Sequence, residues 1–149
     1  MWLADHPGDA QKLRTTPELM TTAVEEFVRY ASPVSHMRRT TTRDLEIDGC
    51  PIAAGQAIQF GIGSANHDET VFESPEQVNL DRRPNRHLAF GSGPHRCVGS
   101  HIGKLTVRVG LEEFLAAVAS FEIEDHEAMT YFASEGRAIT SAPARVVLA

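Results

Sequence analysis

Apolar residues recur at three- and four-residue steps in two stretches of the chain, and this spacing predicts two amphipathic helices. We place the first over residues 17–31, because Thr16-Pro17-Glu18 offers a capping hydroxyl, a proline where a missing N–H costs nothing, and an acid near the helix start. Pro33 cannot continue that helix. The second helix is predicted over residues 100–118, and its broad apolar face indicates that it is largely buried.

Between the two helices, the pattern is typical of short strands and then of irregular structure. Predicted strands cover residues 45–47, 50–52 and 57–60. Asp48-Gly49 tolerates the positive φ of a tight hairpin turn, so the first two strands should pair. In the third strand, alternation places Ile58 and Phe60 on one face and completes a small sheet. Residues 62–89 show little periodicity, and a meander of this length needs contacts that hold it in place.

The two ends of the chain complete the predicted fold class. Turn residues Ser134-Glu135-Gly136 indicate a hairpin, with residues 129–132 before them and residues 144–148 after them. The opening residues up to Arg14 hold a shorter helical pattern that begins without capping signals, which indicates a cut within a longer chain. Together these elements predict an α+β, mostly helical fold, with residues 1–149 forming a single partial domain.

Composition and charge exclude several classes of protein. The chain has 149 residues, of which 42% are hydrophobic and 23% are charged, near globular averages. Its formal net charge of −6 argues against a nucleic-acid partner, whose binders concentrate positive charge. No apolar stretch reaches the roughly 18 to 20 residues that span a bilayer, and no signal peptide is recognisable, so we expect a cytoplasmic location without a membrane partner. Two cysteines, Cys50 and Cys97, are too few for a disulfide framework and should remain thiols.

Cys97 is the candidate for chemistry, because it follows a glycine-rich turn and precedes the second predicted helix. Unpaired N–H groups and the positive helix end near its sulfur favour a thiolate metal ligand. Three residues of the loop have no Cβ, namely Gly91, Gly93 and Gly99. A flat ligand such as haem can therefore lie directly against the backbone. Phe90 can pack beside the sulfur, and His95 can donate to a haem propionate.

Three other interpretations of this loop stay open. A lone cysteine before a helix is most often a buried structural residue. A glycine-rich turn before a helix can bind phosphate, although this run matches neither the dinucleotide-binding nor the Walker pattern. The third alternative is a zinc-binding structural module, because the loop and its neighbours contain several residues of the zinc-ligand types: His87, His95, Cys97 and His101.

The run Phe90-Gly91-Ser92-Gly93-Pro94-His95-Arg96-Cys97-Val98-Gly99 resembles the haem-binding signature of cytochromes P450, in the form that soluble bacterial members show. Glu26-Phe27-Val28-Arg29 resembles the family's Glu-x-x-Arg helix, and Arg39 falls where the family has a propionate-binding arginine. The resemblance implies that the cofactor is haem b (heme b, iron protoporphyrin IX), with Cys97 as the iron ligand. It also implies propionate contacts from His95 and Arg39, and further cofactor contacts from Phe90, Gly91, Gly93, Val98 and Gly99.

The same resemblance gives the meander a purpose, because the family's Glu-Arg pair anchors such a segment and thereby supports the cysteine loop. Without it, Glu26 and Arg29 would be interpreted as a solvated pair at helical spacing. Gln77 stands where the family commonly has arginine, so we expect another arginine to reach the pair, either Arg82 or Arg83. Arg38 likewise competes with its neighbour for the propionate role.

Two further segments resemble parts of the family's substrate pocket. Residues 33–37 resemble the segment beside the distal face of the haem, and residues 136–140 resemble the turn that closes the pocket. Without the resemblance, Val34 and Ile139 would be predicted as core residues and His36 as a loop residue.

The family activity is monooxygenation of a small organic substrate, with electrons from a ferredoxin-like donor. The resemblance covers only the C-terminal part of the family fold, and the family's oxygen-activating central helix is not in this sequence. We therefore assign no catalytic residue within the chain and expect impaired turnover. The alternative function is a non-catalytic haem-binding remnant, or a fragment completed by another polypeptide, for which exposed apolar helix faces would be evidence.

Overall fold

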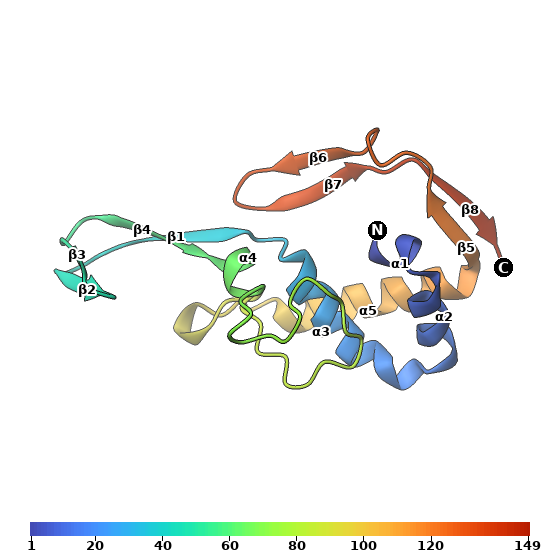
Figure 1. Ribbon diagram of the computed structural model, residues 1–149, viewed down its shortest axis with the longest axis horizontal. Helices are drawn as coiled ribbons and strands as arrows, with labels where there is room; N and C mark the ends of the chain where they lie inside the picture. The colour runs from blue at the N-terminus through green and yellow to red at the C-terminus, as the bar shows by residue number, and fades with distance from the viewer.

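The computed structural model describes all 149 residues and consists of a group of helices from which two long β arms extend (Figure 1). The helices are α1 (Trp2–Asp5), α2 (Pro7–Thr15), α3 (Met20–Ala31), α4 (Ile62–Ala65) and α5 (Ser100–Ala117). A 3₁₀ turn over Pro17–Leu19 precedes α3, so the helix predicted from residue 17 begins its α-helical part at Met20. The helix ends where Ser32 takes a left-handed conformation, with φ of 40°. None of the helices has the length and apolar character that crossing a membrane would require.

The hydrophobic core lies where the first three helices meet α5. Its buried members are Leu3, Ala10, Leu13, Met20, Ala23, Val24, Leu80 and Leu115. The apolar positions of α3 face this core, as the three- and four-residue spacing predicts. The core therefore fixes the position of α3, which carries Glu26 and Arg29, relative to α5, which follows Cys97.

The first β arm is a long hairpin made of two separate antiparallel pairs. Strand β1 (His36–Thr40) pairs with β4 (Ala57–Gly61), and β2 (Leu45–Ile47) pairs with β3 (Cys50–Ile52) at the tip. The three predicted strands and the Asp48-Gly49 turn are confirmed, with positive φ at both turn residues. The single small sheet is wrong, because the chain between the pairs leaves the hydrogen-bonded register and the two ladders do not join.

The second β arm is made of the C-terminal strands. Strand β6 (Thr130–Ala133) pairs with β7 (Arg137–Ser141) across Ser134-Glu135-Gly136, so the predicted turn and the strand before it are confirmed. The prediction that residues 144–148 form the other strand of this hairpin is wrong, because β7 takes that place. The strand predicted over residues 144–148 is β8 (Ala144–Leu148), but its partner is β5 (Val118–Ile123). The sequence pattern missed β5 because its apolar residues continue those of α5 without a turn signal.

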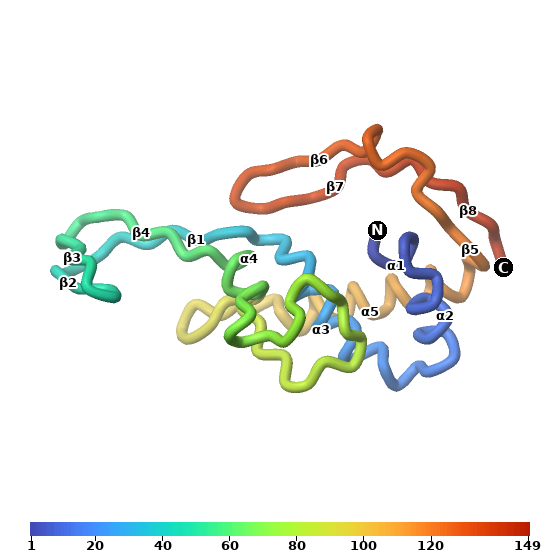
Figure 2. The backbone as a smooth tube through the Cα atoms, in the orientation of Figure 1, coloured from blue at the N-terminus to red at the C-terminus, as the bar shows by residue number.

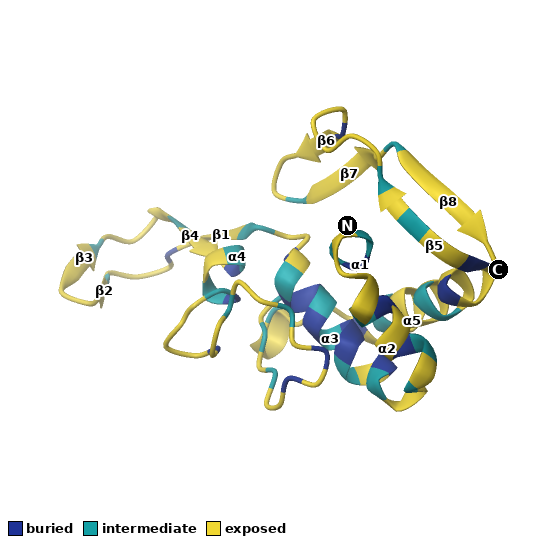
Figure 3. Ribbon diagram, turned by 45° about the vertical axis from the view of Figure 1, so that its right-hand side comes forward, coloured by how far each residue is buried: buried dark blue, intermediate teal, exposed yellow.

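Helix α5 covers the predicted residues almost completely, but the expectation that it is largely buried is wrong. Only Ser100 and Leu115 are buried, whereas the side chains of Ile102 and Leu105 are 72% and 59% exposed (Figure 3). Helix α5 packs on α2 and α3, and its Phe114 contacts Phe121 of β5, but apolar side chains along the rest of the helix, including Ile102 and Leu105, stay exposed.

Candidate functional site

The cysteine loop, residues 90–99, is a tight turn closed by its own backbone. The N–H of Cys97 donates to the carbonyl oxygen of Phe90 at 2.8 Å. Gly91 and Gly93 have φ of +69° and +68°, a left-handed conformation that a side chain would strain. The glycines therefore stand at positions where the turn requires them, as the sequence predicts.

Cys97 presents a free and exposed thiol at the end of this turn. Gly99 is the N-cap of α5, and a Cβ added to it would lie 3.8 Å from the Cys97 sulfur, so glycine leaves that side of the sulfur uncovered. The side chain of Val98 is 99% exposed. The alternative of a buried structural cysteine is therefore wrong, and the sulfur is accessible to a ligand.

A cavity of about 450 Å³ lies between the first β arm and the cysteine loop. It brings together the predicted propionate residues Arg39 and His95, with Gly91 beside them. The rest of its lining is mainly apolar and includes Met37 and Phe60. The other predicted cofactor residues, Phe90, Gly93, Cys97, Val98 and Gly99, do not line this cavity.

Strand alternation places the two neighbouring arginines on opposite faces of β1. Met37 and Arg39 of β1 lie on the cavity face, together with Phe60, which is paired with Met37 across the ladder. Successive side chains of a strand point to opposite faces, so Arg38 points away from the cavity. Arg39 is exposed, and its Nη1 donates to the Arg38 carbonyl oxygen at 2.8 Å.

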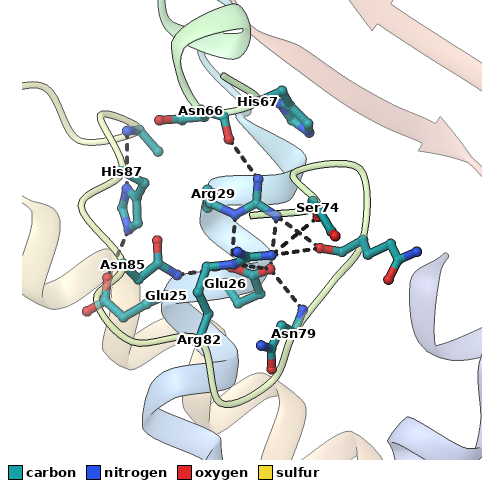
Figure 4. A network of polar contacts seen from close by, with 12 residues as sticks. Glu25, Glu26, Arg29, Asn66, His67, Ser74, Asn79, Arg82, Asn85 and His87 are labelled. Atoms are coloured by element: carbon teal, nitrogen blue, oxygen red, sulfur yellow. Dashed lines mark hydrogen bonds and ion pairs between the residues drawn. The ribbon is translucent and has the colours of Figure 1, made fainter. Parts of the chain in front are cut away.

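Glu26 and Arg29 form a fully buried ion pair on α3 (Figure 4). Arg29 donates from Nε and from Nη2 to the two carboxylate oxygens of Glu26, each at 2.9 Å. The same guanidinium donates to the carbonyl oxygens of Asn66 and Gln77 in the meander. The interpretation as a solvated pair is therefore wrong, because both side chains are 0% exposed and all their polar atoms face protein groups.

Arg82, and not Arg83, completes this network. Its Nε lies 3.0 Å from both carboxylate oxygens of Glu26, and its Nη1 donates to the carbonyl oxygen of Glu73. Arg82 therefore takes the place of the arginine that the family commonly has at position 77. The backbone carbonyl oxygen of Gln77 accepts from both Arg29 and Arg82. Figure 2 shows the meander running in several turns beside α3, and these bonds hold it there.

Two asparagines that sequence reasoning missed connect this network to the rest of the site. Asn66 is fully buried: its amide nitrogen donates to Ser32 Oγ, and its amide oxygen accepts from the Leu88 N–H at 2.7 Å, two residues before the cysteine loop. Asn85 donates to Glu26 Oε2 at 3.0 Å. Asparagine is ordinary in irregular segments, so the sequence carries no signal that separates these two from other loop residues.

The residues considered as zinc ligands do not come together. No three His, Cys, Asp or Glu side chains lie close enough to hold a metal ion jointly. The ring of His87 is instead bonded to the carboxylate of Glu25 on α3, with 2.9 Å between Nε2 and Oε2. This arrangement offers the zinc alternative no ligand set of the usual size.

The two segments assigned to the substrate pocket lie side by side. Val34 forms an isolated antiparallel bridge with Gly136, and the N–H of Arg137 donates to the Pro33 carbonyl oxygen at 2.7 Å. Val34 is 36% exposed and Ile139 is 47% exposed, so the prediction that they are core residues is wrong. Both side chains are therefore partly open to solvent.

Comparison with known proteins decides the family. The family model described as Cytochrome P450 matches residues 3–145. The chain belongs to the cytochrome P450 family. A P450 described as Putative cytochrome P450 126, from Mycobacterium tuberculosis, is 42% identical over 121 residues, which are 81% of this chain and 29% of that relative. Linalool 8-monooxygenase from Pseudomonas putida is also 42% identical over 121 residues, with 81% and 30% covered.

Solved P450 structures share the fold. Cytochrome P450 PksS of the Bacillus subtilis bacillaene polyketide synthase superposes with a TM-score of 0.90 at 36% identity, covering 95% of this chain and 37% of that one. P450BioI, in complex with an acyl carrier protein that carries hexadec-9Z-enoic acid, gives 0.91 at 34% identity, with 97% and 38% covered. The predicted α+β fold of a P450 portion is confirmed, and the chain spans about 29% of the length of the first curated relative.

The ionised carboxylates of Glu25 and Glu26 make the stability of the fold sensitive to acid. Burial alone raises the pKa of Glu26, but hydrogen bonds from Arg29, from the Asn79 N–H and from Arg82 outweigh it, so the pKa lies below its ordinary 4.5. The pKa of Glu25 is also lowered, because bonds from Lys104 and His87 outweigh its burial. A lowered folded-state pKa contributes stability above the ordinary value and loses it as the pH falls through the folded value.

We therefore expect the free energy of unfolding to decrease as the pH falls below about 4.5, the ordinary value for both glutamates. Urea unfolding at a series of pH values measures this loss. The Glu26→Gln variant cannot titrate at this position and should show a shallower pH dependence. An equal pH dependence in both proteins would contradict the assignment to Glu26.

Proposed function

We propose that the chain is the haem-binding portion of a cytochrome P450, forming one partial domain, with the Cys97 sulfur as the axial ligand of haem b. The observation that carries this proposal is the free, exposed thiol at the end of a glycine turn, directly before α5. A thiolate is the haem ligand by which P450s favour O–O cleavage. The glycines beside the sulfur leave the clearance that a flat macrocycle needs.

The residues that line the cavity between the first β arm and the cysteine loop suit the rest of the cofactor. Arg39 and His95 meet at one cavity whose other walls are mainly apolar, which suits an apolar ring system with an anionic edge. We assign these two residues to the propionates. The loop residues assigned to contacts with the macrocycle are Phe90, Gly91, Gly93, Val98 and Gly99.

We assign the Glu26–Arg29 pair to structural support of the haem loop. Together with Arg82, the pair holds the meander against α3. The side-chain oxygen of Asn66 then accepts the N–H of Leu88, just before the cysteine loop. These bonds order the polypeptide that leads into the cysteine loop. Groups that orient a metal ligand in this way commonly change metal affinity when they are removed.

The activity proposed for the complete enzyme is monooxygenation of a small organic substrate, with electrons from a ferredoxin-like donor. Bound haem supplies the electron-transfer and oxygen chemistry. Residues of this chain bind and orient the cofactor, and residues 33–37 and 136–140 face the substrate. Because the chain spans about 29% of a P450 relative, oxygen activation also requires polypeptide that corresponds to the rest of the family fold.

A second candidate function is a fragment that holds haem only when another polypeptide completes it. The exposed apolar surface of α5 favours this candidate, since Ile102 and Leu105 are more than half exposed. Contiguous apolar patches of this kind mark interaction surfaces. In this case the chain alone would bind haem weakly or not at all.

The deciding experiment is a visible spectrum of the purified chain after haem addition and dithionite reduction under carbon monoxide. Thiolate ligation predicts a strongly red-shifted Soret band. If the band is absent and appears only when a polypeptide covering the rest of a P450 fold is added, the second candidate holds. Metal analysis of the same sample tests the zinc module, which requires bound zinc that is lost in His101→Ala.

The Arg82→Ala variant is expected to bind haem about 10 to 100 times more weakly, because the meander loses its bonds to Glu26 and the loop loses rigidity. Arg83→Ala is the matched control, since Arg83 is exposed and contributes nothing to this network. Haem titration followed by the Soret absorbance measures both affinities. Equal affinities would show that the network does not support the haem loop.

A further inference from the structure

A second carboxylate on α3, that of Glu25, contacts the segments on either side of the cysteine loop. Its Oε2 lies 2.9 Å from His87 Nε2, three residues before the loop begins at Phe90. Its Oε1 accepts from Lys104 Nζ at 2.6 Å, and Lys104 lies on α5, seven residues after Cys97. One side chain therefore links the polypeptide before the loop to the helix after it.

The hydrogen bonds of His87 fix the orientation of its ring. The N–H of Ala89 donates to Nδ1 at 3.2 Å, so Nδ1 is the acceptor and the ring proton is on Nε2. Nε2 then donates to the Glu25 carboxylate. The side chain of His87 is only 5% exposed, whereas that of Glu25 is 29% exposed, so the ring is buried while the carboxylate is partly open to solvent.

Both partners of Glu25 contact the ring of Phe90. Lys104 Nζ lies 5.5 Å from the ring centroid of Phe90, within the range of a cation–π contact. The centroids of the His87 and Phe90 rings are 6.1 Å apart. A Cβ on Gly103 would lie 3.5 Å from the Phe90 ring, so the ring rests closely against the backbone of α5.

Phe90 in turn holds Cys97, because its carbonyl oxygen accepts the Cys97 N–H at 2.8 Å. We propose that Glu25, His87 and Lys104 form a polar clamp that positions Phe90, and through it the sulfur of Cys97, for ligation of haem. The clamp residues are positioning residues. The proposal rests on the proposed haem function of Cys97.

The adjacent glutamates Glu25 and Glu26 contact different parts of the site. Figure 4 shows Glu26 among groups of the meander, whereas Glu25 turns toward His87. The Glu26 network orders residues 66–85, and the clamp acts on the loop itself. Loss of the clamp should therefore loosen the cysteine loop while the meander stays in place.

Lys104→Met keeps the length of the side chain and removes the charge that contacts Glu25 and Phe90. In the chain without haem, we expect hydrogen exchange of the Cys97 amide to accelerate about tenfold, with exchange of the α3 core amides unchanged. In the haem-loaded chain, we expect a smaller fraction of the reduced carbon monoxide complex to show the red-shifted Soret band. Lys104→Arg should restore both values.

Arg108→Met is the matched control, because Arg108 lies one turn further along α5 and pairs with Glu112 in an exposed position. Unchanged Cys97 exchange in Lys104→Met would overturn the clamp, whatever the spectrum shows. Faster exchange with an unchanged band would also overturn it, because the sulfur would then be positioned without these residues. If the unaltered chain gives no red-shifted band, either alone or with a polypeptide covering the rest of a P450 fold, the haem function fails, and the role claimed for the clamp in haem ligation is overturned with it.

Discussion

Replacing Cys97 with alanine is expected to abolish the red-shifted Soret band of the reduced, haem-loaded chain under carbon monoxide. Alanine removes the sulfur that would ligate the iron, and the loop holds no other thiol. The backbone of the loop should persist, because Gly91 and Gly93 keep their conformation and the N–H of residue 97 still donates to Phe90. The band therefore reports ligation and not folding.

Cys50→Ala is the matched control for this loss. Cys50 is the other free, exposed cysteine, and it lies in β3 at the tip of the first β arm. This variant should keep the full band. A band that survives in Cys97→Ala, or that disappears in Cys50→Ala, would contradict the assignment of Cys97 as the ligand.

Glu26→Gln is expected to lower the free energy of unfolding by about 3 to 5 kcal/mol, since it removes one partner of a buried charge network. Arg29 and Arg82 would both lose their carboxylate, and neither can move into water without breaking its bonds to backbone carbonyls. The amide of glutamine also places donors where two guanidinium groups already donate.

Urea unfolding measures this effect, with Glu113→Gln as the control. Glu113 is an exposed glutamate on α5, so its replacement should change the free energy of unfolding by less than about 0.5 kcal/mol. Similar losses in the two variants would mean that the buried charge of Glu26 does not hold the meander to α3.

Several elements could be predicted from the sequence because their causes are local. Asp48-Gly49 accepts the positive φ of a tight turn, and the strands on either side of it pair as expected. The signature at residues 90–99 likewise predicted a glycine turn that ends directly before a helix. Turn chemistry acts within a few residues, so it can be recognised without a tertiary structure.

Burial and strand pairing could not be predicted in the same way. Periodicity shows that α5 has an apolar face, but not whether another element covers it, and Ile102 is 72% exposed. The strand β8 was expected, yet its partner β5 lies more than 20 residues earlier in the chain. Pairing at this separation depends on how the whole chain folds.

The sequence by itself determined the family, the cysteine loop and the Glu-Arg pair on α3, because a ten-residue signature and helical spacing are short-range patterns. Only the tertiary structure decided that Arg82 completes the pair, that Arg39 and not Arg38 faces the cavity, and that Glu25 contacts His87 and Lys104. Glu26 and Arg82 are 56 residues apart. Buried charges are stable only when oppositely charged or hydrogen-bonding groups surround them. Which groups can reach Glu26 depends on how the meander packs against α3.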